Sequence, residues 1–200
     1  MIWITVMLKL LERLSEEEKA LFLRKKLEKG NVLFRENERC EFVGIVLSGS
    51  LKIVSYLSDG KEIIYNEPQA GQMFGNNLIF SSEPYYKGDI VCQNDAEIDL
   101  ISKENLLKLL SKNSLFLTDY LKAQSDFTKD LNDKIKLLAI SGAEERLLYY
   151  LNLHRNQITY DSITSLANTL FLERETLSRT ISRMEAKRSI SRQGKTITLL

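Results

Sequence analysis

A segment near the C-terminus combines charged and hydroxyl side chains that could read a nucleic acid. Apolar residues at Leu177, Ile181 and Met184 have the spacing of a helix with one buried face. The opposite face, with Arg174 at its entrance, carries Glu175, Ser178, Arg179 and Ser182. An arginine can donate two hydrogen bonds to guanine, and a glutamate can accept one from the amino group of cytosine. This face therefore has the chemistry to read bases in a major groove.

The neighbouring segments predict a scaffold that would present this helix. Ile163, Leu166, Ala167 and Leu170 have the spacing of a shorter helix, which begins near Asp161. A break at residues 171–173 separates the two helices, and the second is followed by a strand, a tight turn and an alternating strand. Helix, turn, helix and β-hairpin form a winged helix-turn-helix. The alternative is an amphipathic pair of helices whose charged face only meets solvent.

Charge is distributed unevenly along the chain. Residues 155–200 contain eight basic and four acidic residues, so they carry +4, while the whole chain carries +1 and the first 154 residues carry −3. A basic end on an acidic body favours a polyanionic partner. Arg192 and Lys195 flank the predicted turn of the hairpin and would approach phosphate. We expect contacts to the DNA backbone from Ser182, Arg192, Lys195 and Thr196.

A long helix is predicted ahead of this basic segment, since residues 103–140 contain neither Gly nor Pro. Seven positions follow a heptad pattern, and five of them are apolar: Leu117, Leu121, Gln124, Thr128, Leu131, Ile135 and Leu138. Such a narrow stripe is typical of a helix that pairs with a copy of itself. It could instead pack on its own domain. Residues 141–144 then break the pattern, which predicts a hinge near 139–142, where Ser141 could cap the next helix.

The front of the chain reads as a β-rich domain, because seven of the nine glycines and both prolines lie between residues 30 and 88. These residues separate or flank short β-rich runs, at residues 32–34, 42–47, 51–57, 62–65, 90–92 and 98–101. Asp59-Gly60 predicts a hairpin turn, and many short strands predict a sandwich or barrel. Before them, residues 10–26 read as a helix with Ser15 as N-cap. Met1–Leu8 lacks a preceding basic residue, so we expect no signal peptide there.

These motifs together resemble the CRP/FNR family of transcription regulators. The recognition helix and wing of that family resemble Arg174-Glu175-Thr176-Leu177-Ser178-Arg179, Met184-Glu185 and Gly194-Lys195-Thr196-Ile197. Its cyclic-nucleotide-binding-type barrel resembles residues 30–34, 49–51, 59–62 and 71–75. The resemblance extends in order and spacing over about residues 15–200.

The resemblance implies an α+β fold made of three parts. Residues 1–112 would form an effector or sensor domain, a β-barrel of the double-stranded β-helix (jelly-roll) type with flanking helices. Residues 113–139 would form the dimerisation helix, and residues 140–200 the winged helix-turn-helix. A homodimer would then place one recognition helix in each half-site of a palindrome, with TGTGA-like or TTGA-like half-sites about 34 Å apart. As an activator, it would also contact RNA polymerase.

The resemblance also assigns residues to the DNA interface and shows two departures. By position, Arg174, Glu175 and Arg179 match base-reading residues of the family, and Ser178 matches the serine of the FNR branch. Phe171 replaces the usual small residue of the turn, and Glu173 replaces the usual Ser or Thr cap. The geometry of the turn is therefore less firmly predicted than the recognition helix.

The cyclic-AMP site of the family is not retained. Asn76 stands where the phosphate and ribose are held by Glu, Tyr86-Lys87 stand in place of the Arg-Ser pair, and Leu131-Asn132 in place of the adenine-contacting Thr-Ser. A buried phosphate needs the bidentate fork of arginine, so we do not expect cyclic AMP. The candidate pocket for another small molecule is Asn76, Asn77, Tyr86, Lys87 and Asn132. The protein could also work without an effector.

The sequence lacks the residues that an enzyme or a metal site would need. Its two cysteines, Cys40 and Cys92, are far apart, and its one histidine, His154, lies beyond the barrel at an expected helix end. A metal-dependent cupin would need two or three histidines inside the barrel. We therefore expect no catalytic residue, metal or cofactor, no membrane partner, and a cytoplasmic protein. A barrel module with a non-functional helix-turn-helix is the alternative to a DNA reader.

Overall fold

The computed structural model describes residues 11–200. Contacts divide the chain into two compact units, Met1–Ser125 and Asp126–Leu200, and the division falls within helix α4 (Ser114–Ala139). The Met1–Leu8 stretch, for which no signal peptide is expected, lies outside the described residues, as do the first ten residues of the predicted barrel domain.

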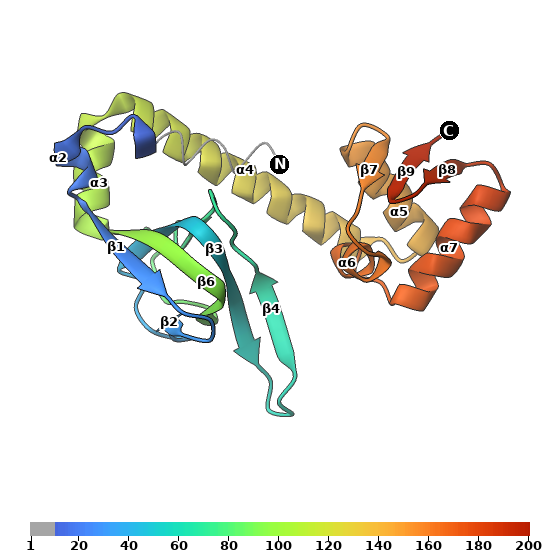
Figure 1. The fold of residues 1–200 in the computed structure, drawn as a ribbon, viewed down its shortest axis with the longest axis horizontal. Helices are drawn as coiled ribbons and strands as arrows, with labels where there is room; N and C mark the ends of the chain where they lie inside the picture. Colours follow the sequence, from blue (N-terminus) through green and yellow to red (C-terminus); the bar gives the residue numbers. More distant parts are fainter. Residues whose placement is uncertain (1–10) are drawn as a thin grey trace. The chain divides into compact units, whose positions relative to one another are not determined.

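The first unit is built around an antiparallel six-stranded sheet, shown in blue to green in Figure 1. Its main path runs in the order β1-β6-β3-β4, while β2 pairs with β6 and β5 pairs with β3. The strands are β1 (Phe22–Leu27), β2 (Val32–Phe34), β3 (Phe42–Tyr56), β4 (Glu62–Asn66), β5 (Met73–Phe74) and β6 (Asp89–Ser102). Antiparallel pairing of these strands around one core agrees with the predicted barrel.

Two pairs of predicted strands are continuous in the structure. The runs 42–47 and 51–57 belong to β3, and the runs 90–92 and 98–101 belong to β6. Their mutual register shifts between Val46 and Leu51, which lets long strands bend without ending. Gly49 lies at this bend with φ +76°, and a Cβ there would collide with Asp95 O. Glycine therefore marks a bulge at this position rather than a break.

The N-terminal helix is much shorter than predicted. Ser15 does cap a helix, because its hydroxyl accepts from the Glu18 N–H and the Glu18 carboxylate accepts from the Ser15 N–H. That helix, α2 (Glu16–Lys19), has a single turn, and the predicted helix over 10–26 is wrong beyond it. The following residues form β1, which pairs with β6 along its whole length. Pairing with a distant strand overrides the local helical pattern.

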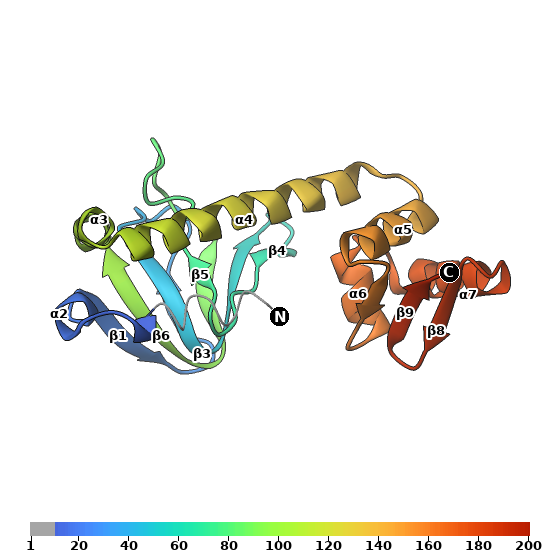
Figure 2. The ribbon, with the colours of Figure 1, turned by 90° about the horizontal axis from the view of Figure 1, so that it is seen from above.

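Two helices close the barrel core. The core contains large buried side chains from the strands and their connections, including Ile45, Leu51, Phe74, Ile79, Tyr86 and Ile98. Helix α3 (Lys103–Lys112) adds Leu106 and Leu109, and the first part of α4 adds Phe116 and Tyr120. This first part of α4 lies along the barrel in both views (Figures 1 and 2). The barrel interior is therefore filled largely by the chain's own side chains.

The second unit has the predicted winged helix-turn-helix, with one additional strand. Its elements after α4 are α5 (Ala143–Leu153), β7 (Gln157–Thr159), α6 (Ile163–Thr169), α7 (Arg174–Ala186), β8 (Ile190–Gln193) and β9 (Thr196–Leu199). The sheet order is β7-β9-β8, and the hairpin β8–β9 lies beside α7 (Figure 2). Leu137, at the end of α4, is buried in the same core as Leu147 and Ile181.

The predicted hinge coincides with the connection between α4 and α5. Helix α4 ends at Ala139 and α5 begins at Ala143. The N-cap of α5 is Gly142, which has no side chain to cap the helix, so Ser141 does not take that role. At the far end of α5, His154 is the C-cap residue, as predicted.

Candidate nucleic-acid interface

Helix α7 has one buried face and one exposed face. Leu177, Ile181 and Met184 are fully buried, and Thr180 is buried beside them. The exposed residues include all the predicted base-reading side chains, Arg174, Glu175, Ser178 and Arg179, together with Ser182. Helical periodicity alone places these side chains on one outer surface. The structure thus brings together, on one helix, the residues chosen from the sequence.

The turn before α7 accommodates the unusual Phe171. Its φ is +53°, in the left-handed region that favours glycine, and its ring is 42% exposed. The turn is closed by hydrogen bonds from Phe171 N to Asn168 O at 3.1 Å and from Leu172 N to Ala167 O at 2.9 Å. Glu173 is the N-cap residue of α7, but its side chain makes no capping hydrogen bond. The backbone therefore forms the turn without the small residue or the Ser/Thr cap.

Basic side chains of α7 differ in how far their charge is neutralised. Arg183 and Lys187 both pair with Glu144 of α5, at 3.2 and 3.5 Å. Within residues 11–200, Arg179 has no carboxylate within ion-pairing distance, and Arg174 reaches only its neighbour Glu175 at 3.6 Å. Arg183 and Lys187 therefore tie α7 to α5, while the charge of Arg179 is not neutralised by a carboxylate within the described residues.

The hairpin carries two exposed basic residues, and one of them, Arg192, is linked to α7. Gly194 has φ +59° at the tip, and Gln193 pairs with Thr196 across it. Arg192 Nε lies 3.7 Å from Glu185 Oε1, which links the wing to the end of α7. Lys195 is exposed and forms no ion pair within the described part of the chain. Thr196, which is predicted to contact the DNA backbone, is already hydrogen-bonded within the sheet, because its Oγ1 lies 3.1 Å from Thr159 Oγ1.

The apolar stripe of α4 is mostly exposed. Leu121, Leu131, Ile135 and Leu138 are each about half exposed, Thr128 is exposed and Leu117 is partly buried. Gln124 differs, because its side chain is bonded within its own unit. Its Oε1 accepts from Asn76 Nδ2 at 2.6 Å, and its Nε2 donates to Asn76 O at 2.5 Å. Four large apolar side chains of the stripe are therefore available for pairing.

The predicted pocket residues lie in different surroundings. Asn76 is buried and bonded to Gln124, and the Tyr120 hydroxyl donates to Asn76 O at 3.3 Å. Burial raises the pKa of Tyr120 to about 12, so this hydroxyl stays protonated at neutral pH. Asn77 and Lys87 are exposed. Asn132 is exposed and belongs to the second unit.

Tyr86 is part of the barrel core. Its ring stacks on Phe34 with centroids 4.7 Å apart, and its hydroxyl donates to Phe42 O at 3.1 Å. Burial, the strongest influence, raises the pKa of this hydroxyl well above its usual range. Both the ring and the hydroxyl of Tyr86 therefore make contacts within the barrel core.

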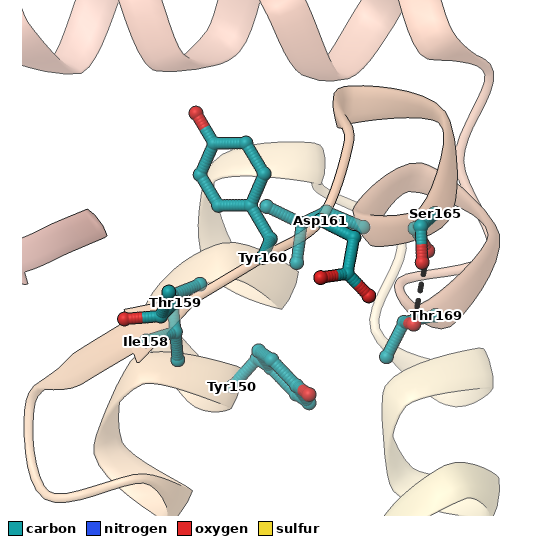
Figure 3. Close-up of a pocket in the computed structure, with 8 residues that line it drawn as sticks. Tyr150, Ile158, Thr159, Tyr160, Asp161, Ser165 and Thr169 are labelled. Atoms are coloured by element: carbon teal, nitrogen blue, oxygen red, sulfur yellow. Dashed lines mark hydrogen bonds between the residues drawn. The ribbon is translucent and has the colours of Figure 1, made fainter. Parts of the chain in front are cut away.

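Two surface hollows lie away from these residues. One, of about 180 Å³, lies beside α6 and is shown in Figure 3. It is lined by Tyr150, Ile158, Thr159, Tyr160, Asp161, Ser165, Leu166 and Thr169, and Thr169 Oγ1 donates to Ser165 O across its wall. The other is lined by Gly49, Ser50, Gln69, Ala70 and Asn94. Neither contains a residue of the predicted pocket.

Residues 11–200 contain neither a cluster of metal ligands nor a helix that could span a membrane. No three residues among His, Cys, Asp and Glu are grouped so that they could hold a metal ion. No helix there combines the length and the apolar character needed to cross a bilayer.

Comparison with known proteins identifies relatives of both units. Residues 24–113 match the family model of the cyclic nucleotide-binding domain. The anaerobic regulatory protein of Bacillus subtilis is 28% identical over 161 residues, which cover 80% of this chain but only 63% of the relative. The probable transcriptional regulator flp of Lacticaseibacillus casei is 25% identical, and the match covers 98% of this chain and 93% of the relative. Both are named as regulators and not as enzymes.

Solved structures share the fold at lower identity. The catabolite activator protein of Thermus thermophilus has 20% identity and a TM-score of 0.55, and the match covers 96% of this chain and 93% of that structure. A CooA mutant from Carboxydothermus hydrogenoformans also has 20% identity, with a TM-score of 0.70 and coverage of 96% and 90%. The predicted order of barrel, long helix and winged helix-turn-helix therefore agrees with known folds.

Proposed function

Because the chain belongs to the CRP/FNR family of transcription regulators, we propose that it is a sequence-specific DNA-binding regulator. The observation that carries this proposal is the exposed face of α7. Arg174, Glu175, Ser178 and Arg179 are all exposed there, and the wing residue Lys195 is exposed nearby in the fold. Bases would be read by α7 in the major groove, while Arg192 and Lys195 would contact phosphates.

The regulator acts as a homodimer on a palindrome. The supporting observation is the row of half-exposed apolar side chains on α4, which a single copy leaves in water. Burial of each such side chain against a second copy is favourable by about 1 kcal/mol or more. Two copies of α7 related by a two-fold axis would then read two half-sites, as palindromic operators require. As an activator, the dimer would also contact RNA polymerase, in the cytoplasm.

Control by cyclic AMP is not part of this proposal. Asn76 takes the position of the family's acidic ligand to the nucleotide, and its amide is already bonded to Gln124 of α4. Lys87 is exposed and offers a point charge instead of a planar fork. The protein responds to a different small molecule or binds DNA without an effector.

Selection from random DNA tests the proposal. The full-length protein, purified without added ligand, is incubated with a random duplex library, and the bound pool is sequenced. Enrichment of one palindrome is the expected result. The matched control is Arg174→Ala/Glu175→Ala/Arg179→Ala, which keeps the buried face of α7 intact and should enrich nothing. If both proteins enrich the same sequence, α7 is not the reading element. If neither enriches any sequence, with or without candidate small molecules, the alternative of a non-functional helix-turn-helix stands.

A further inference from the structure

Arg146 of α5 joins two distant stretches of the second unit. Its Nε donates to Ile140 O at 2.5 Å, and its Nη2 to Leu138 O at 3.5 Å. Its Nη1 donates to Phe171 O at 2.6 Å and to Leu170 O at 3.2 Å. Leu138 lies in the last turn of α4 and Ile140 directly follows the helix, while Leu170 and Phe171 lie in the turn before the recognition helix. One guanidinium thus holds four main-chain carbonyls from two elements.

These carbonyls are groups that need a donor. The last carbonyls of a helix have no partner within the helix, and Leu138 lies in the last turn of α4. Phe171 has a left-handed backbone, so its carbonyl lies outside any helical pattern. The planar guanidinium presents five N–H groups in a fixed fork, and a cation is also favoured at the C-terminal end of a helix. Lysine, which offers a single ammonium group, could not hold both elements in the same way.

A second set of contacts fixes the same end of α4 to α5. The Tyr149 hydroxyl donates to Asp133 Oδ1 at 3.0 Å, and Lys136 Nζ lies 4.7 Å from the centre of the Tyr149 ring. Leu137, the residue after Lys136, is buried in the core of the second unit. The last turns of α4 are therefore packed as part of the DNA-binding unit, and Arg146 adds the link to the turn of the helix-turn-helix.

We propose that Arg146 is a positioning residue that sets the direction of α7 relative to the end of α4. This inference rests on the proposed dimeric DNA reader. In a dimer paired through α4, that direction determines which separation and rotation of half-sites the two recognition helices can reach together. One added base pair rotates a half-site by about a tenth of a helical turn, so a fixed direction selects one spacing. Arg146 therefore controls spacing selectivity without touching a base.

The test uses the full-length protein and a series of the selected palindrome in which the central spacer is shortened or lengthened by one and two base pairs. Wild type should prefer one spacing over its neighbours by about tenfold, the scale of one lost base contact. Arg146→Met should bind the preferred spacing more weakly and lose most of the preference among spacings. Arg146→Lys keeps the charge but not the fork, and it should show the same loss of preference.

Arg155→Met is the matched control. It removes the same kind of side chain from the exposed loop after α5 and should keep the wild-type spacing profile. Amide hydrogen exchange gives a second readout. Residues 138–140 and 170–172 should both exchange faster in the Arg146 variants, while the buried amides of α7 keep their rates.

Two outcomes would overturn the proposal. One is an Arg146→Lys variant that folds and keeps the full spacing preference. The other is an equal loss of affinity at every spacing, which would assign Arg146 to general stability or charge. If Arg146→Met fails to fold, the spacing profile and the amide hydrogen exchange of Arg146→Lys still test the proposal. A wild type that selects no palindrome, with or without candidate small molecules, would instead refute the proposed function.

Discussion

Arg179 and Arg183 show how two arginines one helical turn apart can be assigned to different tasks. Arg183 and Lys187 both pair with Glu144, so the charge of Arg183 helps to hold α7 against α5. Arg179 is exposed on the same helix, and no carboxylate of the described chain reaches it. A side chain that is free to move can adjust to a guanine edge at the cost of its own rotamer entropy.

Replacing Arg179 by Ala should therefore weaken binding selectively. We expect a loss of about 1–3 kcal/mol on the selected palindrome and a relaxed preference at one base pair of each half-site. Competition binding with every single-base variant of the half-site measures both effects. A loss of the same size on random DNA would mean that Arg179 contacts only phosphate.

Lys195→Ala is the matched comparison, because it also removes one exposed basic side chain from the same unit. A phosphate contact carries no sequence information, so all DNA sequences should lose affinity similarly. The dependence of log K on log salt should flatten by about one unit of slope. Titrations at several salt concentrations check this, and an unchanged slope would remove Lys195 from the backbone contacts.

At the scale of elements, sequence reasoning succeeded where structure is local. The helices α6 and α7 and the hairpin β8–β9 lie where periodicity and the Gly194 turn predicted them, since each pattern depends on neighbours along the chain. Strand β7 was missed because three residues carry too short a pattern. The helix predicted over 10–26 was wrong beyond α2 because its second half pairs with β6, far away in sequence.

The candidate sites also contain features that local sequence predicts and features that depend on residues far apart in the chain. Exposure of the α7 residues follows from helical geometry and could be predicted. The bond between Asn76 and Gln124 joins residues 48 positions apart, so no local pattern indicates it. Arg146 was also missed, since a single arginine on a helix gives no signal until the carbonyls of Leu138 and Phe171 lie beside it.

Substitution of Gly49 tests how much the bulge in β3 contributes to the stability of the barrel. Gly49→Ala adds a Cβ that would meet Asp95 O and lie 2.8 Å from Ala96 Cα. Gly60 also has positive φ, +82°, but nothing lies within 4 Å of an added Cβ. We expect Gly49→Ala to lower the free energy of unfolding by about 1–3 kcal/mol more than Gly60→Ala, because only the first forces the strands apart. Urea denaturation of both variants measures the difference, and equal losses would show that the bulge yields easily.

The cap of α2 should give the barrel unit a dependence on pH. Hydrogen bonds from the Ser15 N–H and, next in strength, from Asn113 lower the pKa of Glu18 below its ordinary value. A lowered pKa means that the folded state prefers the carboxylate. Its contribution is complete above the ordinary pKa of about 4.3 and is lost as the pH falls through the lowered value.

Glu18→Gln removes this titration and keeps an oxygen that can accept from Ser15. The variant should therefore be less stable than wild type at neutral pH, and the difference should shrink as the solution is acidified. Denaturation curves of both proteins from neutral to acidic pH give the comparison. A difference that stays constant with pH would mean that Glu18 titrates normally.

At the scale of the whole molecule, the exposed row on α4 predicts the oligomeric state. Leu131→Glu places a charge in the middle of that row and should shift the protein to monomers, since burial of an unpaired carboxylate is costly. Leu115→Glu is the control, because Leu115 is 69% exposed on the same helix but lies outside the heptad stripe. Sedimentation at micromolar concentration distinguishes the two. If Leu131→Glu sediments like wild type, α4 is not the pairing surface.

The burial of both thiols has a practical consequence for spectroscopy. Cys40 and Cys92, the chain's two cysteines, are 2% and 1% exposed, and burial raises the pKa of each. Maleimide dyes react with accessible thiolates, so they should hardly label the two native cysteines of the folded protein. Gln193→Cys, at the exposed tip of the wing, would accept a single fluorophore without removing any existing thiol. Its emission would then report, in real time, each arrival of the wing at a duplex.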